Sequence, residues 1–178
     1  DKLGAVPLPP YIHKPLEDTE RYQTVYARVK GSVAAPTAGL HFTRDLLDRI
    51  RAQGVELAFV TLHVGWDSFR PVKTEHIESH SLDAEYYELG KGTADAVNRA
   101  KPEGRRVVSV GTTAVRLLEH TASSRAGSGV AVSASDGALA AGSGWADIFI
   151  LPGHRFRIVD SLLTNFHLPR STLLMLTS

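Results

Sequence analysis

Two short apolar runs, each placed between helix-forming segments, constrain the fold of this chain most strongly. Val55 to Val64 is apolar and rich in β-branched and aromatic residues, which is typical of a buried strand. Arg105 to Val110 predicts a second buried strand, and a helical pattern that extends through His120 follows it after a short turn. Because strands alternate with helices, we predict the α/β fold class, a layered domain with a largely parallel sheet flanked by helices.

The length of 178 residues suits one domain with a substantial core. Residues 1–17 are rich in proline and should form an extended arm, whereas residues 18–178 should form the α/β domain. Ser, Ala and Gly dominate residues 122–144, so we expect a flexible loop there. The chain starts without Met and ends within an apolar run, which suggests a piece of a longer protein.

Apolar spacing and capping residues predict the remaining elements. Tyr22, Val25, Tyr26 and Val29 lie on one face of a helix if residues 20–30 are helical. The other expected elements are a helix over 44–53 with Thr43 as N-cap and Gly54 at its end, helical pieces over 82–100 broken near Gly90 and Gly92, strands over 146–151 and 155–159, a loop with short helical content over 160–169, and a last helix capped by Ser171 or Thr172.

The stretch from Gly31 to Thr43 is too rich in small residues to be a core element. Its glycines permit close approach of a ligand to the backbone, and Pro36 keeps the preceding residue extended. His41 stands between two bulky apolar residues and could point at such a ligand, or could be an ordinary polar group in a tight connection.

Gly111, Thr112 and Thr113 follow the second predicted strand and begin a helix. Backbone N–H groups at such a helix start, together with the helix dipole, can form an anion pocket to which Arg116 adds positive charge. Simple capping by Thr112 or Thr113 uses the same groups, so both interpretations stay open.

Several classes of protein are not supported by the sequence. The formal charge of +1 does not by itself indicate nucleic-acid binding, and no apolar run approaches the length of a membrane span. No dinucleotide-binding glycine pattern and no nucleoside-triphosphatase loop are present. His76 and His80 flank Glu78 in an order that differs from the zinc-binding His-Glu-x-x-His pattern, so we predict no metal site, and a metal-dependent hydrolase is a minor alternative.

Ordered motifs along nearly the whole chain resemble one family. The first is Gly-Ser-Val-Ala-Ala-Pro-Thr-Ala-Gly-Leu-His-Phe, from Gly31 to Phe42. The others are Leu8-Pro-Pro-Tyr-Ile12, Asp18 to Ala27, Leu62-His-Val-Gly65, Phe69-Arg-Pro-Val72, Val110-Gly-Thr-Thr113 with Val115-Arg116 and Leu118-Glu119, Ile148-Phe-Ile150 with Pro152-Gly153, Thr164-Asn-Phe-His-Leu-Pro169 and Ser171 to Leu176. Together they resemble the S-adenosylmethionine:tRNA ribosyltransferase-isomerases of queuosine biosynthesis.

The resemblance implies a cytoplasmic transferase that moves and isomerises the ribosyl group of S-adenosylmethionine onto 7-aminomethyl-7-deazaguanine in tRNA, giving epoxyqueuosine-tRNA. It implies S-adenosylmethionine as a substrate, no metal or redox cofactor, tRNA as partner, no membrane association and a monomer. It also implies that the family's β-barrel region is absent from this chain, which would be the C-terminal α/β portion.

The chemistry requires groups that move protons and groups that bind anions and bases. Histidines and carboxylates suit the first task, and arginines and backbone N–H groups suit the second. Asn165 and His167 flank Phe166 in a triplet that could stack a base and bind its edges, or could be a buried turn. The predicted catalytic residues are His41, His63, His80, Glu85 and His167. The predicted substrate-binding residues are Thr37, Gly39, Arg70, Gly111, Thr112, Thr113, Arg116, Asn165, Phe166 and Ser171.

Two segments depart from the family pattern. Trp66-Asp67-Ser68 stands where a smaller run is usual, and Leu82-Asp83 stands where a Met-His pair is usual. The alternative function is therefore a diverged or inactive paralogue that binds tRNA or a nucleoside without this chemistry. The basic cluster formed by Arg99, Lys101, Arg105 and Arg106 is either a solvated rim, which we favour, or a phosphate track.

Overall fold

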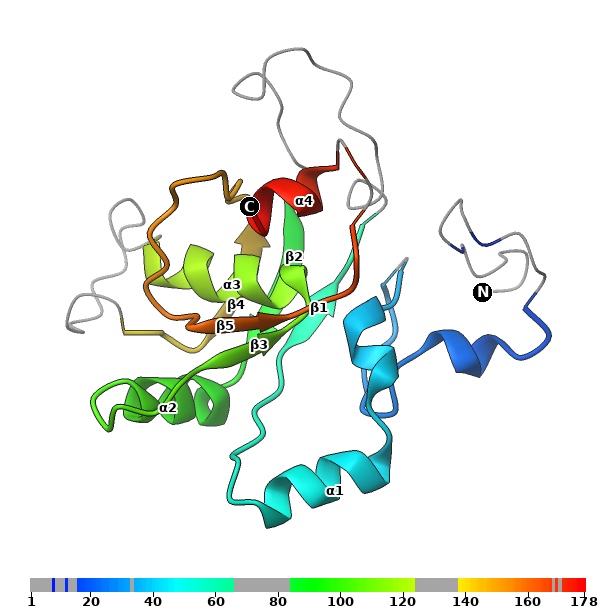
Figure 1. Ribbon diagram of the computed structural model, residues 1–178, viewed down its shortest axis with the longest axis horizontal. Coiled ribbons are helices and arrows are strands. Elements are labelled where there is room, and N and C mark those ends of the chain that lie inside the picture. The colour runs from blue at the N-terminus through cyan, green and yellow to red at the C-terminus, as the bar shows by residue number, and fades with distance from the viewer. Residues whose placement is uncertain are drawn as a thin grey trace.

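The computed structural model describes residues 8, 12, 16–32, 34–65, 84–123, 138–167, 169 and 171–178. Figure 1 shows strands and helices from both halves of the described chain packed together. Their order is η1 (Thr19–Tyr22), η2 (Thr37–His41), α1 (Arg44–Ala52), β1 (Thr61–His63), β2 (Glu85–Leu89), α2 (Lys91–Ala100), β3 (Val108–Val110), α3 (Thr112–Ser123), β4 (Gly142–Ala146), β5 (Ser161–Leu163) and α4 (Thr172–Leu176), where η denotes a 3₁₀ helix.

The strands form two small sheets. One has the order β1-β2-β4 and both of its strand pairs are antiparallel. The other pairs β3 with β5 in parallel, with Val110 opposite Leu163. The α/β class is confirmed, but the expectation of a largely parallel sheet is wrong because the larger sheet is antiparallel.

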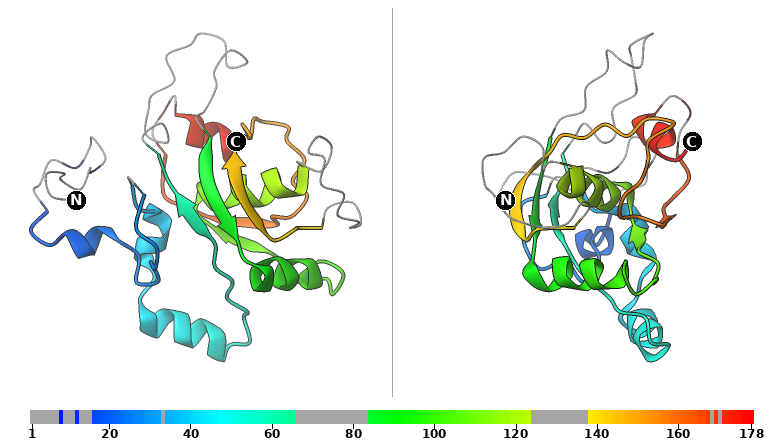
Figure 2. Two further views of the ribbon diagram at one scale, coloured as in Figure 1. Left: turned by 180° about the vertical axis from the view of Figure 1, so that it is seen from behind. Right: turned by 90° about the vertical axis from the view of Figure 1, so that its left-hand side faces the viewer.

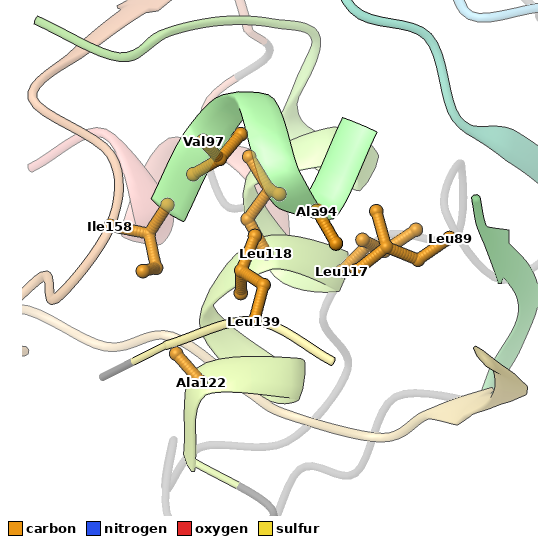
Figure 3. Packing of buried hydrophobic residues seen from close by; sticks show 8 residues of the cluster. All are labelled: Leu89, Ala94, Val97, Leu117, Leu118, Ala122, Leu139 and Ile158. Atoms are coloured by element: carbon orange, nitrogen blue, oxygen red, sulfur yellow. The ribbon is translucent and has the colours of Figure 1, made fainter. Parts of the chain in front are cut away.

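Helix α3 lies between the two sheets, as the right-hand view of Figure 2 shows. Its apolar side chains are buried on more than one face, and Leu117 has no exposed surface. Figure 3 shows how α2, α3 and the ends of neighbouring strands and loops share one apolar cluster. The cluster consists of Leu89, Ala94, Val97, Leu117, Leu118, Ala122, Leu139 and Ile158. Burying each leucine, isoleucine or valine side chain of this cluster contributes on the order of 1.5–3 kcal/mol, so the cluster stabilises the packing of α2 and α3 against the end of β2.

The helix starts that were predicted from capping residues are confirmed. The Thr43 hydroxyl accepts the N–H of Leu46 at the start of α1, and Gly54 has a φ of +80° just beyond its end. The Ser171 hydroxyl likewise accepts the N–H of Leu174 at the start of α4. A side-chain cap satisfies one of the free N–H groups at a helix start, which is why these local signals succeed.

Other predicted elements are wrong. Residues 23–30 are not helical, because Tyr22 and Thr24 are buried and Tyr26 packs on Phe59 through tertiary contacts. Residues 85–89 form a strand instead of a helix, and only residues 61–63 and 108–110 of the two predicted apolar strands pair in sheets. The strands expected over 146–151 and 155–159 are absent from those described residues, apart from Ala146 at the end of β4.

The loop expected over 122–144 is wrong at both of its ends. Ala122 and Ser123 complete α3, and Gly142 to Gly144 lie in β4. Gly144 stands opposite Tyr87, whose ring occupies the space beside it, so the partner strand supplies the side chain that this segment lacks. Residues 124–137, like most of the predicted N-terminal arm, lie outside the described residues.

Candidate functional site

The stretch from Gly31 to Thr43 is tied to the end of β1 at its beginning. The Ser32 hydroxyl accepts the N–H of Val64 at 2.9 Å and donates to the carbonyl of Ala34 at 2.7 Å. Ala34 forms an antiparallel bridge with Val64, and Gly31 has a φ of +134°, which favours glycine. These contacts hold the stretch against the sheet before it turns into η2.

Helix η2 contains three predicted site residues, Thr37, Gly39 and His41. Gly39 packs against Tyr26 and Thr24 so closely that a Cβ atom would lie 2.8 Å from the Thr24 methyl group. Burial raises the pKa of the Tyr26 hydroxyl. Gly39 is therefore needed to seat η2 on the protein, whereas the sequence had suggested that it lets a ligand approach.

Asn165 brings the chain beyond β5 into contact with η2. Its side-chain N–H donates to the Thr37 hydroxyl at 2.8 Å, and its side-chain oxygen lies 3.0 Å from Nε2 of His41. With the amide oriented in this way, the oxygen accepts a proton carried on Nε2 of His41. In the neutral ring, Nδ1 is then the nitrogen with a free lone pair.

Phe166 and His167 follow Asn165 and have opposite surroundings. Phe166 is fully exposed, at 108% of its reference surface. His167 is half-buried, its Nε2 lies 3.2 Å from the Thr164 hydroxyl, and burial lowers the pKa of its imidazole. Asn165 and His167 thus hold the loop to the protein while Phe166 projects from it.

The turn after β3 lies beside the chain leaving β5, because the carboxyl ends of parallel strands meet at one edge of a sheet. The N–H of Gly111 donates to the carbonyl of Leu163 at 2.9 Å, and Gly111 has a φ of +89°. Thr112 is buried at the start of α3, and Thr113 lines a small pocket with Arg116 and Thr172. The cavity measures about 10 Å³ and has room for about one water molecule.

Arg116 and Glu85 form an ion pair inside the protein. Nη1 of Arg116 lies 2.8 Å from a carboxylate oxygen of Glu85, and the two side chains are 6% and 4% exposed. The guanidinium also donates to the carbonyls of Ile148 and Ala146. Arg116 was predicted as an anion clamp and Glu85 as a proton-transfer group, but in the structure they satisfy each other.

Comparison with known proteins supplies the deciding observation. The family model described as queuosine biosynthesis protein matches residues 1–178, the whole chain. This chain belongs to that family. It is 57% identical to the S-adenosylmethionine:tRNA ribosyltransferase-isomerase of Natranaerobius thermophilus over all 178 residues, which cover 49% of that protein.

The fold of this family member is also similar to a solved structure. The crystal structure of S-adenosylmethionine tRNA ribosyltransferase from Thermotoga maritima matches with a TM-score of 0.57 and 37% identity. The match covers 79% of this chain and 39% of that one. The present chain therefore spans about half the length of the curated relative.

The remaining predicted residues of this family member are dispersed. His63 lies in β1, where its ring packs between Gly31 and the Tyr86 ring 5.5 Å away, and within the described chain it makes no hydrogen bond or ring contact with His41. Ser171 caps α4. Arg70 and His80, together with the two segments that depart from the family pattern, lie outside the described residues.

The predicted basic cluster is largely neutralised. Arg99 pairs with Glu56, Lys101 with Asp160, and Arg105 with both Glu56 and Glu103. Hydrogen bonds from Lys101 and from a backbone N–H lower the pKa of the Asp160 carboxyl. These pairs support a solvated rim and do not support a phosphate track.

Glu119, a buried carboxylate on α3, is not among the predicted site residues. Its oxygens accept the backbone N–H groups of Arg157, Ile158 and Val159 at 2.8–3.0 Å, and Nε2 of His154 lies 3.6 Å away. A carboxylate on an otherwise apolar helix stripe was the available signal, since a buried charge requires such partners. Glu119 holds the loop that leads into β5.

Two absences apply to the residues that the structure describes. They include no group of three or more histidine or acidic side chains that could hold a metal ion. None of their helices is both long enough and apolar enough to cross a membrane.

Proposed function

We propose that this chain is the α/β portion of a cytoplasmic enzyme that transfers and isomerises the ribosyl group of S-adenosylmethionine onto 7-aminomethyl-7-deazaguanine in tRNA. The family match over the whole chain supports the reaction class. The observation that carries the site is the cluster of Thr37, His41 and Asn165, which joins two segments 124 residues apart beside an exposed aromatic ring.

His41 is the general base in this proposal. Its Nε2–H is held by Asn165, so Nδ1 keeps a free lone pair that can take a proton from the ribose carbon next to the sulfonium. Thr37 fixes the amide of Asn165 and thereby the orientation of the ring. Asn165 and Thr37 are thus positioning residues, not groups that hold the substrate.

Phe166 is the stacking platform for the base. Its ring is fully exposed although both neighbouring side chains are anchored, and an aromatic face of this kind can stack on a deazaguanine. The neutral imidazole of His167 anchors the other side of the loop, because burial lowers its pKa. Gly111, whose N–H is bonded to the Leu163 carbonyl, fixes the adjacent start of α3, where Thr113 offers a hydroxyl group.

Mass spectrometry of nucleosides from tRNA tests the proposal. The protein, S-adenosylmethionine and tRNA bearing 7-aminomethyl-7-deazaguanine should yield epoxyqueuosine, and His41→Gln should lower the rate about 10²- to 10⁴-fold. The matched control is His120→Gln, because His120 lies beside Asp147 and Tyr87 and outside the cluster. Binding of tRNA without any product would instead support the diverged, non-catalytic paralogue, and equal loss in both variants would contradict the role of His41.

A further inference from the structure

The outer face of the antiparallel sheet carries a row of ring side chains that the proposed site does not use. Side chains alternate along its strands, and Tyr87, Leu89 and Leu62 face the core cluster. Three ring residues therefore share the opposite face. His63 of β1, Tyr86 of β2 and Trp145 of β4 stand in register across the three strands.

These rings contact one another; His63 and Tyr86 are half-buried, and Trp145 is exposed. The His63 and Tyr86 centroids are 5.5 Å apart, and the Tyr86 and Trp145 centroids are also 5.5 Å apart at 69°. Trp145 is 63% exposed on an edge strand whose neighbouring residues are Ser143 and two glycines. Cross-strand pairing accounts for about 0.5–1.5 kcal/mol, but it does not require an indole whose surface is mostly in water.

A basic segment lies against the β1 end of this row. Residues 21–44 contain Arg21, Arg28, Lys30 and Arg44 and no acidic residue. The segment is attached at the free edge of β1, where Ala34 pairs with Val64 and where a Cβ on Gly31 would lie 2.7 Å from the His63 ring. Figure 1 shows this blue segment beside β1, on the side away from β2.

The cations of this segment differ from Arg99, Lys101 and Arg105, which are paired with carboxylates. Arg28 and Lys30 are exposed, and neither makes an ion pair with another described residue. On the sheet itself the one carboxylate of the outer face is Glu88, which is paired across the strands with Thr61 and lies two residues along β2 from Tyr86. Positive charge therefore flanks the rings at the Gly31 end of the row.

We propose that this face binds a single-stranded segment of RNA, with bases stacked on Tyr86 and Trp145 and phosphates beside Arg28 and Lys30. Aromatic residues on an open sheet face with adjacent cations are a common arrangement for single-stranded RNA, because every base has a stacking face and every nucleotide has a phosphate. The proposal rests on the proposed function for its partner. It adds a surface outside the His41 cluster that holds nucleotides flanking the modified base.

Fluorescence titration with RNA tests this surface directly. The chain has two tryptophans, so Trp66→Phe leaves Trp145 as the single reporter. A seven-nucleotide single-stranded RNA should quench Trp145, and an abasic strand of equal length should not. Because stacking contributes on the order of 1–3 kcal/mol per base, Trp145→Ala should weaken binding by about 5- to 150-fold, measured by anisotropy of labelled RNA.

Two further variants separate stacking from charge. Lys30→Ala should reduce the salt dependence of binding by about 0.7 in the log–log slope, since one phosphate contact is lost. Phe156→Ala is the matched control, because Phe156 is an exposed aromatic residue that packs on His154 instead. Its affinity for RNA should be unchanged.

Unquenched Trp145 fluorescence on RNA binding, or equal affinity of Trp145→Ala and the parent protein, would overturn the proposal. A concentration-dependent dimer that shields Trp145 in the absence of RNA would overturn it as well. Neither titration uses S-adenosylmethionine. Loss of ribosyl transfer with intact RNA quenching would therefore count against the proposed reaction and not against this surface.

Discussion

Glycine is required at position 39 because the neighbouring side chains leave no space for a Cβ atom. A Cβ atom there would lie 2.8 Å from the Thr24 methyl group and would also collide with the Tyr26 hydroxyl. Thr24 is buried, and Tyr26 packs on Phe59 with ring centroids 5.3 Å apart, so neither residue can easily move away.

We expect Gly39→Ala to lower the free energy of unfolding by about 1–3 kcal/mol through overpacking. The control is Gly92→Ala in α2, where nothing lies within 4 Å of the added atom and where alanine should raise stability by about 0.4–1 kcal/mol. Urea unfolding measures both changes. Equal effects of the two substitutions would contradict this account of η2.

His167 makes stability depend on pH. Burial lowers the pKa of its imidazole in the folded protein below the unfolded value of about 6.5. As pH falls through about 6.5 the unfolded chain therefore binds the proton first, and the free energy of unfolding decreases until the folded pKa is passed. Above about pH 7 both states are neutral at this residue and the contribution disappears.

His167→Gln should remove this contribution. The difference in the free energy of unfolding between the parent protein and the variant should grow in favour of the parent as pH rises from about 5 to about 7. Denaturant unfolding at a series of pH values measures it. Parallel pH profiles for the two proteins would show that His167 does not titrate as its burial requires.

The sequence indicated three candidate residues that the structure brings together, but it did not indicate how they contact one another. His41, Asn165 and Thr37 were all candidates, and the structure joins them. That Asn165 orients the His41 ring could not be foreseen, because the two residues are 124 positions apart in the sequence. For the same reason Arg116 and Glu85 were assigned separate roles, although their proximity makes them partners.

At the scale of the elements, Arg116 attaches α3 to the antiparallel sheet. Its guanidinium pairs with Glu85 of β2 and donates to carbonyls at and beyond the end of β4. Arg116→Met should lower the free energy of unfolding by about 3–5 kcal/mol, since it leaves a buried carboxylate without its cation. The double variant Arg116→Met, Glu85→Leu should lose less than the sum of the single losses.

Urea unfolding of the two single variants and the double variant forms the cycle that measures this coupling. Additive losses would contradict it, because they would mean that each side chain is stabilised by other contacts. The far-ultraviolet circular dichroism of each variant checks that α3 is retained.

Elements defined by local chemistry were predictable, and those defined by distant partners were not. Helices α1 and α4 begin where capping hydroxyls meet apolar stripes. Residues 157–159 looked like a strand, but their N–H groups bond to Glu119 of α3 instead of to a neighbouring strand. Glu56 and Phe59 of the first apolar run likewise bind α2 and the turn after it through Arg99, Arg105 and Thr93.

At the scale of the whole molecule, alternation of strands and helices predicted the class but not the direction of the strands. Direction depends on which strands pair, and β4 was not recognised because glycine and serine dominate it. In the structure it pairs with β2 and completes the antiparallel sheet, so among the described strands the parallel arrangement occurs only between β3 and β5. That short parallel pair is what places Gly111 beside the chain that carries Asn165 to His41.

The central claim is that the Gly31–Thr43 stretch and the chain after β5 meet through His41 and Asn165 as one hydrogen-bonded unit. Nuclear magnetic resonance of ¹⁵N-labelled histidine measures this most directly, with His41→Gln to assign the signals. We predict that the neutral His41 ring is protonated on Nε2 alone in the parent protein and becomes a mixture of both tautomers in Asn165→Ala. Identical tautomer populations in the two proteins would contradict the account.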